Sequence, residues 1–181
     1  MINTKKILIT GGPGAGKTSL IYELEKRNFN CEHEIVRSLT IQGKKNGNDQ
    51  AFLIEPLKFT KKLLDLRINQ FNKIQKNEIT FYDRGVHDTL AYLKYINVNI
   101  GDDLIKKCLK IKYNRVFVLP PWEKIYQRDD CRYESFEESK KIFNQIIKTY
   151  EYFEMNTIIL KQGTIEDRVD KILSYIKMIR K

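Results

Sequence analysis

The stretch GGPGAGKT, from Gly11 to Thr18, has the residue types and the spacing of a phosphate-binding loop. Glycine reaches backbone angles that other residues avoid, so consecutive N–H groups can turn inward around an anion. The lysine adds a positive charge for the outer phosphates, and the hydroxyl that follows it is suited to Mg²⁺. The sequence therefore predicts a site for a magnesium nucleoside triphosphate, with ATP favoured and GTP possible. The expected nucleotide-binding residues are Gly12, Gly14, Ala15, Gly16, Lys17, Thr18 and Ser19.

Asp83 and Arg84 form a second chemical group, directly after the apolar run Ile79–Tyr82. Ligands of open parallel sheets bind at the carboxyl ends of the strands, and Asp83 is expected at such an end. Its carboxylate can hold Mg²⁺ together with Thr18, or orient a substrate hydroxyl, and Arg84 can bind a substrate phosphate or carboxylate. The alternative is an ion pair between the two neighbours in a local turn.

Glu34 and Arg37 lie three residues apart, just after a weak strand-like run at Asn30–His33. On a helix the two side chains would share one face. Beside a phosphate loop, Glu34 is a candidate catalytic base for an attacking hydroxyl, and Arg37 is a candidate substrate-binding residue. The alternative is a salt bridge on a helix surface.

Arg128 and Arg132 lie four residues apart, among acidic residues and after the apolar run Val116–Leu119. Phosphoryl transfer spreads negative charge over the moving group, and an arginine that closes over this group stabilises the charge. We therefore expect a lid at about residues 126–136 that carries both arginines as catalytic residues, with Arg128 also binding the nucleotide, and that excludes water. An exposed helix of mixed charge is the alternative.

Other motifs separate the classes of protein that share a phosphate loop. GTP switches usually carry DxxG and NKxD motifs, but Asp83–Val86 lacks the final glycine and Asn72–Gln75 lacks the aspartate. In motor-type ATPases the strand that carries the second, acidic motif usually ends in Asp-Glu. Here the corresponding strand ends in Asp83, and Arg84 follows it. The residues present are better suited to phosphoryl transfer to a bound small molecule.

The elements that must position these residues follow from the alternation of apolar runs and helical patterns. Five strand-like runs separated by helices predict right-handed crossovers and a parallel sheet in an α/β fold, covered on both faces. Helices are expected after Lys17, from Pro56, from the capping box Ser135–Glu138 and after Thr164. The expected strands are Lys6–Thr10, Asn30–His33, Ile79–Asp83, Val116–Leu119 and Thr157–Leu160.

Composition limits the remaining possibilities. A length of 181 residues suits one domain, residues 1–181. The net charge of +10 comes from lysines scattered along the chain, which predicts solvated helix faces and argues against nucleic acid as a partner. No apolar run approaches the ~18 residues of a membrane span. Three separated cysteines without a CxxC pair are typical of reduced thiols, so we expect a cytoplasmic protein. Its oligomeric state is not predicted.

Motifs spread along nearly the whole chain give it the likeness of a known family. They are ILITGGPGAGKTSLI, EIVRS, FYDRGVHDTLAYL, VFVLPPWEKIYQRDDCRYESFEES and EDRVDKIL. With them the chain resembles the P-loop nucleoside-kinase-like group of NadR-type AAA domains. The resemblance implies a three-layer α/β/α P-loop fold of the nucleotide-kinase type, with a sheet of strand order 2-3-1-4-5 and an arginine lid. It also implies ATP-dependent phosphorylation of a nucleoside or a similar metabolite.

Carried over residue by residue, the pattern of this group falls on positions already singled out. His87 occupies a position often filled by proline, and we expect it to be structural or adjacent to the substrate. A regulatory ATP- or GTP-binding protein that hydrolyses slowly and acts through a protein partner remains the alternative function. The matching positions are Gly16, Lys17, Thr18, Glu34, Arg37, Asp83, Arg84, Arg128 and Arg132.

Overall fold

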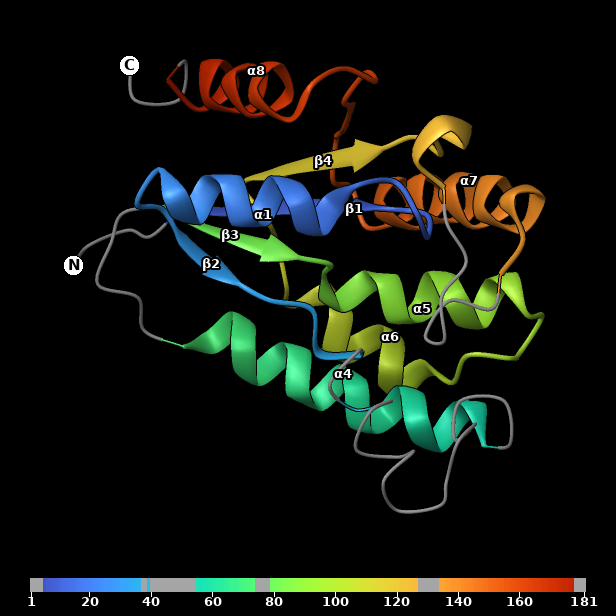
Figure 1. The fold of residues 1–181 in the computed structure, drawn as a ribbon. Coiled ribbons are helices and arrows are strands. Elements are labelled where there is room, and N and C mark those ends of the chain that lie inside the picture. The colour runs from blue at the N-terminus through green and yellow to red at the C-terminus, as the bar shows by residue number, and fades with distance from the viewer. Residues whose placement is uncertain (1–4, 37–38, 40–54, 74–78, 127–133, 178–181) are drawn as a thin grey trace.

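The computed structural model describes residues 5–36, 39, 55–73, 79–126 and 134–177 (Figure 1). Within them, a parallel sheet is covered by helices. The strands are β1 (Lys5–Gly11), β2 (Asn30–Glu32), β3 (Ile79–Asp83), β4 (Arg115–Leu119) and β5 (Thr157–Ile159). The helices are α1 (Lys17–Lys26), α4 (Pro56–Asn72), α5 (Val86–Tyr95), α6 (Asp102–Leu109), α7 (Phe136–Tyr152) and α8 (Ile165–Lys177), with a short 3₁₀ helix, η1 (Glu123–Ile125).

The sheet has the strand order β2-β3-β1-β4-β5, and all of its pairings are parallel. Strand β1 is central, with Leu8 opposite Tyr82 of β3 on one side and Val116 of β4 on the other. The predicted five-stranded α/β fold and its strand order are confirmed. Because the strands are parallel, the loop after β1 and the residues after β2 and β3 meet at one edge of the sheet.

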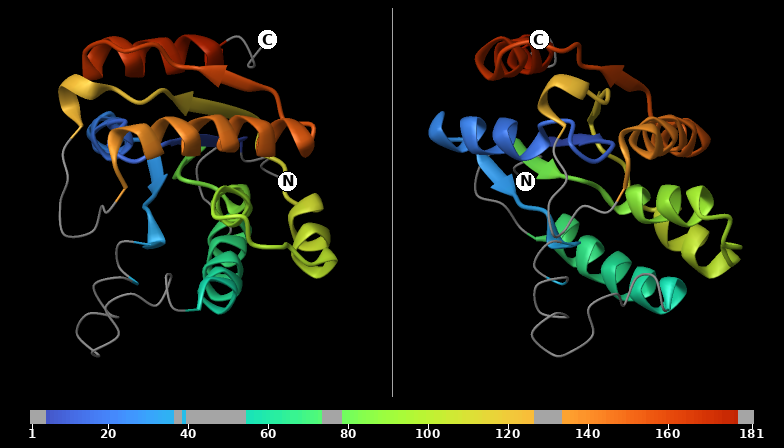
Figure 2. Two further views of the ribbon diagram at one scale, coloured as in Figure 1. Left: turned by 90° about the vertical axis from the view of Figure 1, so that its right-hand side faces the viewer. Right: turned by 45° about the vertical axis from the view of Figure 1, so that its right-hand side comes forward.

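Side chains of the central strands alternate between two buried cores. Leu8 packs in a core with residues of α4, α5, α6 and α7, whereas Ile7 and Ile9 pack in a second core with α1 and α8. The two helix groups lie on opposite sides of the sheet (Figure 2). Burial on both faces explains why the strands have continuous apolar sequences. No helix in the described part of the chain is long and apolar enough to span a membrane.

The helix boundaries follow the signals in the sequence. Pro56 is the first residue of α4, and the Ser135–Glu138 capping box opens α7, with the Glu138 N–H donating to the Ser135 hydroxyl at 3.2 Å. The Asp167 N–H donates to the Thr164 hydroxyl at 3.1 Å, just before α8. Side-chain oxygens thus satisfy helix N–H groups that have no partner within the helix.

Asp88 ties three elements together behind the edge of the sheet. Its carboxylate accepts hydrogen bonds from the Thr10 hydroxyl of β1, from the Gly85 N–H and, at 3.0 Å, from the Tyr150 hydroxyl of α7. Asp88 is buried, so each of these bonds satisfies a group that water cannot reach. This network fixes the start of α5 against the end of β1.

His87 is structural, because it lies in the core and away from the sheet edge. Its side chain is fully buried, and Nε2 lies 3.1 Å from the carbonyl oxygen of Cys108 at the end of α6. The ring packs against Tyr150 and Phe153. Burial lowers the pKa of His87 to about 4.

We expect this histidine to make the fold sensitive to acid. The pKa of His87 is about 4 in the folded protein and 6.5 ordinarily, so the folded state binds fewer protons between these values. The free energy of unfolding should fall by up to about 3 kcal/mol as the pH decreases from 6.5 to 4. The change is measured by denaturant unfolding at several pH values.

The His87→Leu variant should lack this part of the pH dependence, although its stability at pH 7 will also change. His33, whose side chain is 46% exposed, provides the control: His33→Gln leaves His87 in place, so the fall in stability between pH 6.5 and 4 that His87 causes should remain. Parallel pH profiles for wild type and His87→Leu would contradict the assignment.

Candidate active site

The loop between β1 and α1 has a backbone that depends on glycine at two points. Gly11 has φ +142°, and a Cβ at this position would lie 2.3 Å from the carbonyl oxygen of Leu119 on β4. Gly16 has φ +82° and directly precedes α1 in the left-handed conformation. Any larger residue at Gly11 would push β4 away, so the tight strand-to-helix turn requires glycine there.

Neighbouring elements fix the outside of this loop. The Ser139 hydroxyl of α7 donates to the carbonyl oxygen of Pro13 at 2.8 Å. The ring of Tyr126 lies against Gly14, where a Cβ would approach Cδ2 of the ring to 2.5 Å. The loop is therefore held in one shape by α7 and by Tyr126, which directly follows η1.

Lys17 is buried inside the loop. Its Nζ donates to the carbonyl oxygens of Gly11, at 3.1 Å, and Gly12, at 2.8 Å. Burial, followed by the charge of Arg84, lowers the pKa of Lys17 to about 7, although the nearby carboxylates act in the opposite direction. An anion bound in the loop would raise this pKa again and stabilise the ammonium form.

Thr18 and Asp83 come from different elements and meet beside the loop. The Thr18 hydroxyl donates to Oδ2 of Asp83 at 3.3 Å, whereas Oδ1 of Asp83 is buried without a hydrogen-bond partner in the described part of the chain. Burial, followed by the charge of Glu34, raises the pKa of Asp83 to about 6. An unpartnered buried carboxylate oxygen and a hydroxyl are hard donors that fit Mg²⁺. Ser19, the next residue, is exposed on α1.

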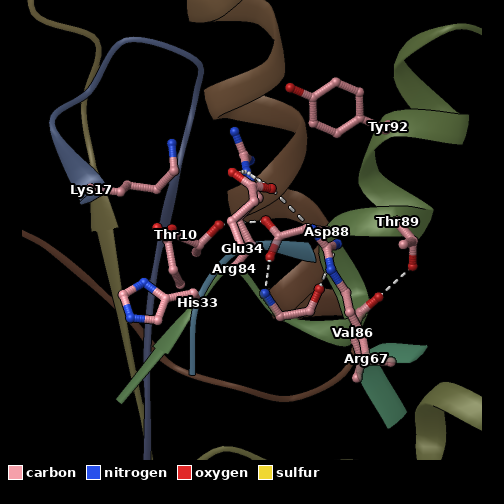
Figure 3. A network of polar contacts seen from close by, with 12 residues as sticks. Thr10, Lys17, His33, Glu34, Arg67, Arg84, Val86, Asp88, Thr89 and Tyr92 are labelled. Carbon is pink, nitrogen blue, oxygen red and sulfur yellow. Dashed lines mark hydrogen bonds and ion pairs between the residues drawn. The ribbon is translucent and has the colours of Figure 1, made fainter. Parts of the chain in front are cut away.

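Glu34 joins the ends of β2 and β3 through an ion pair (Figure 3). Nε of Arg84 lies 2.8 and 2.9 Å from its two carboxylate oxygens. Nη2 of Arg67, on α4, lies 3.4 Å from Oε1, and Nη1 of Arg67 donates to the carbonyl oxygen of Gly85 at 2.9 Å. One carboxylate thus contacts two buried guanidinium groups.

Electrostatics keep Glu34 ionised. Burial alone would raise its pKa, but the charges of Arg84, Arg67 and Lys17 outweigh burial and lower the pKa of Glu34 below its ordinary value. Arg84 is paired with Glu34, fifty residues away, and not with its neighbour Asp83 as in the alternative of a local turn. Arg84 adopts φ +67°, an uncommon conformation for a residue other than glycine.

The carbonyl oxygen of Gly11 connects the loop to this ion pair. It accepts from Nζ of Lys17 at 3.1 Å and from Nη1 of Arg84 at 3.2 Å. Tyr92 of α5 is also near this pair, with its ring centroid 5.8 Å from the Arg84 guanidinium carbon. The phosphate loop and the Glu34–Arg84 pair are therefore two sides of one site.

Three of the residues predicted for the site, Arg37, Arg128 and Arg132, lie outside the described residues. So do most positions of the expected lid, of which Tyr126 and residues 134–136 are described. In contrast, Arg67 was missed by reasoning from the sequence. It lies in the middle of α4 with only 4% of its side chain exposed, and its one signal in the sequence is its place on the apolar face of the helix, three residues after Leu64 and four before Phe71.

A family model described as an AAA domain matches residues 6–168. The chain belongs to this AAA domain family. The match covers the phosphate loop, Glu34, Asp83 and Arg84, and the resemblance to NadR-type P-loop domains is confirmed. No curated protein matches the sequence significantly.

Solved structures that share this fold include a nucleoside kinase and a nucleotide kinase. Deoxyadenosine kinase from M. mycoides, with products dCMP and dCDP bound, has a TM-score of 0.69 and 16% identity, over 96% of this chain and 99% of that chain. Thymidylate kinase from Candida albicans has a TM-score of 0.70 and 16% identity, over 98% and 93%. NadR in complex with NR has a TM-score of 0.72 and 16% identity, over 96% of this chain but 52% of NadR.

The ion pair predicts a large effect of one mutation on stability. Glu34→Gln removes the carboxylate that Arg84 and Arg67 both contact and leaves them buried without it, so the free energy of unfolding should fall by about 3 kcal/mol. Chemical denaturation at pH 7 measures the change. Asp65→Asn is the control, because Asp65 pairs with Lys107 across α4 and α6 at an exposed site, where the loss should stay below about 1 kcal/mol. Equal losses in both variants would argue against a buried charge pair.

Proposed function

We propose that this protein is a phosphotransferase that uses MgATP to phosphorylate a hydroxyl group of a small metabolite such as a nucleoside. The observation that carries the proposal is the carbonyl oxygen of Gly11, which Lys17 and Arg84 share. Through this shared contact, the phosphate loop and the buried acid–arginine pair lie at the same edge of the sheet. The nucleoside and nucleotide kinases among the structural neighbours support the same reaction class.

The nucleotide side of the proposal rests on the phosphate loop. Its N–H groups and Lys17 bind the β- and γ-phosphates, with Thr18 and Asp83 as the residues that would hold Mg²⁺. When bound, Mg²⁺ supplies neutralisation of the negative charge that develops on the phosphate oxygens. Lys17 gains its full charge as the triphosphate enters, since the anion offsets the burial that lowers its pKa.

The acceptor side rests on Glu34 and Arg84. Arg84 orients the carboxylate of Glu34, which is ionised at neutral pH and accepts the proton of the attacking hydroxyl. A base of low pKa is sufficient, because phosphoryl transfer has a loose transition state that needs little nucleophile activation. Arg37 is proposed to bind the substrate, and Arg128 and Arg132 to close over the transferred group.

The charges at this site favour an uncharged acceptor. Arg84 and Arg67 both contact Glu34, and the carboxylates of Asp83 and Asp88 also act on Arg84, so an acceptor phosphate would meet little uncompensated positive charge from these guanidiniums. A phosphate group on the acceptor would also lie close to the Glu34 carboxylate, which would repel it. We therefore favour a nucleoside over a nucleoside monophosphate.

A panel assay tests this function. Purified protein is supplied with MgATP or MgGTP and with each of a set of nucleosides and nucleoside monophosphates, and release of the nucleoside diphosphate is followed. We expect release that depends on a nucleoside, and a loss of at least about 100-fold in kcat/KM for Lys17→Met, because a loop lysine stabilises the transition state. Lys26→Met, an exposed position on the same helix, should behave as wild type.

The outcomes of the panel separate the alternatives. Release that is independent of every acceptor would favour a regulatory nucleotide-binding protein or slow NTPase. Release that requires a monophosphate would overturn the preference for an uncharged acceptor.

Glu34→Gln separates a catalytic role of this carboxylate from a purely structural one. At a temperature well below its unfolding transition, we expect kcat to fall by about 100-fold, the scale of general base catalysis, with little change in the affinity for MgATP. Steady-state kinetics and calorimetry of nucleotide binding provide the two numbers. An equal loss in affinity without a loss in kcat would make Glu34 structural.

A further inference from the structure

Arg168 is a buried cation behind the phosphate loop, and it has no role in the reaction proposed for this site. It lies in the first turn of α8, on the opposite face of the sheet from Arg67. Its neighbours in that turn, Glu166 and Asp167, are exposed, yet Arg168 has only 4% of its surface exposed. The side chain thus points inward, to the loop rather than to solvent.

The guanidinium of Arg168 contacts the backbone of the loop. Nη2 donates to the carbonyl oxygen of Ala15 at 3.3 Å, and Nη1 lies 3.2 Å from the place that a Cβ on Gly16 would occupy. In a trans peptide, the C=O of one residue and the N–H of the next point in opposite directions. By holding the Ala15 oxygen, Arg168 therefore sets the direction of the Gly16 N–H, which points away from the guanidinium.

The charge of Arg168 is not balanced within the described part of the chain. Among the described residues, its Nε is buried without a hydrogen-bond partner, and the guanidinium donates to a neutral carbonyl rather than to a carboxylate. Burial lowers the pKa of Arg168. An uncompensated buried charge costs several kcal/mol, so an arginine retained in such a place calls for a source of negative charge.

We propose that Arg168 is a positioning residue of the phosphate loop, which turns the Gly16 N–H toward the bound polyphosphate and whose own charge the polyphosphate balances. The inference rests on the proposed function in that it requires a polyphosphate in the loop. Arg168 acts through the Ala15–Gly16 peptide and through its charge, without touching the ligand. It therefore serves affinity for the polyphosphate and not the choice of acceptor.

Two variants and one control test the proposal. Arg168→Met keeps the apolar stem and removes the charge, and Arg168→Lys keeps the charge but loses the guanidinium. Lys171→Met removes a positive charge from an exposed position one turn along α8. For each protein, affinities for MgATP and for inorganic tripolyphosphate are measured by calorimetry, and melting temperatures are measured with and without MgATP.

We expect Arg168→Met to bind both ligands at least about tenfold more weakly, the scale of one hydrogen bond to a charged group. Arg168→Lys should retain part of the affinity, and Lys171→Met all of it. Without ligand, the melting temperature of Arg168→Met should equal or exceed that of wild type, because an unbalanced buried charge is removed. A residue that only docked α8 would instead give a lower melting temperature in this variant and unchanged affinity.

The failures can be told apart. If wild-type protein binds neither MgATP nor tripolyphosphate, the proposed function fails and this inference fails with it. If wild type binds and Arg168→Met binds equally well, only the role of Arg168 is overturned. If Arg168→Met does not fold, Arg168→Lys decides: wild-type affinity for tripolyphosphate together with a lowered melting temperature would assign Arg168 to the docking of α8.

Discussion

The ion pair between Glu34 and Arg84, shared with Arg67, is the interaction on which the rest of the site depends. These side chains come from the ends of β2 and β3 and from the middle of α4, and all are at least three-quarters buried. Two guanidinium groups and the Lys17 ammonium within one edge of a sheet would repel each other strongly in the low dielectric of the interior. The carboxylates of Glu34, Asp83 and Asp88 together reduce this repulsion, and Glu34 is held in place by the two guanidiniums that it contacts.

A site with so many buried charges needs a rigid frame. The fold provides this frame at the carboxyl end of β1, which lies between β3 and β4 in the sheet. Strand β1 is central, and the glycine at its end lets the chain pass close to β4 without a side chain between them. Asp88 fixes the start of α5 to β1 and α7 through three hydrogen bonds. None of these groups is proposed to touch a substrate, but they determine where the loop and the ion pair lie relative to each other.

The fold is shared with kinases that phosphorylate quite different acceptors, so architecture by itself does not choose the acceptor. What the chain adds is the balance of charges around Glu34. We propose that arginines already paired with carboxylates select against a phosphate-bearing acceptor, and that the unpartnered Asp83 oxygen and the buried lysine favour a metal and a polyphosphate on the other side. The two halves of the site thus differ in electrostatic character although they share the Gly11 carbonyl oxygen.

The sequence by itself determined the strands, four of the helices and the phosphate loop, because these depend on local rules, whereas α5 and α6 were not among the helices expected from it. Apolar runs of five to seven residues, helix caps such as Ser135 and the spacing of glycines with Lys17 act over short distances along the chain. The short strand β2 was the weakest of these signals, because its three residues are only partly buried and carry little hydrophobic pattern. The order of the strands entered through the resemblance to a family and not through local rules.

Only the tertiary structure decided which charges pair and which are buried. Glu34 and Arg84 are fifty residues apart, Arg67 approaches from a helix that the sequence marks only as amphipathic, and Arg168 reaches the loop from the far end of the chain. Charged residues look alike in a sequence whether they are solvated or buried. The difference arises when folding removes water from some of them, because only then does each need a specific partner at a specific distance.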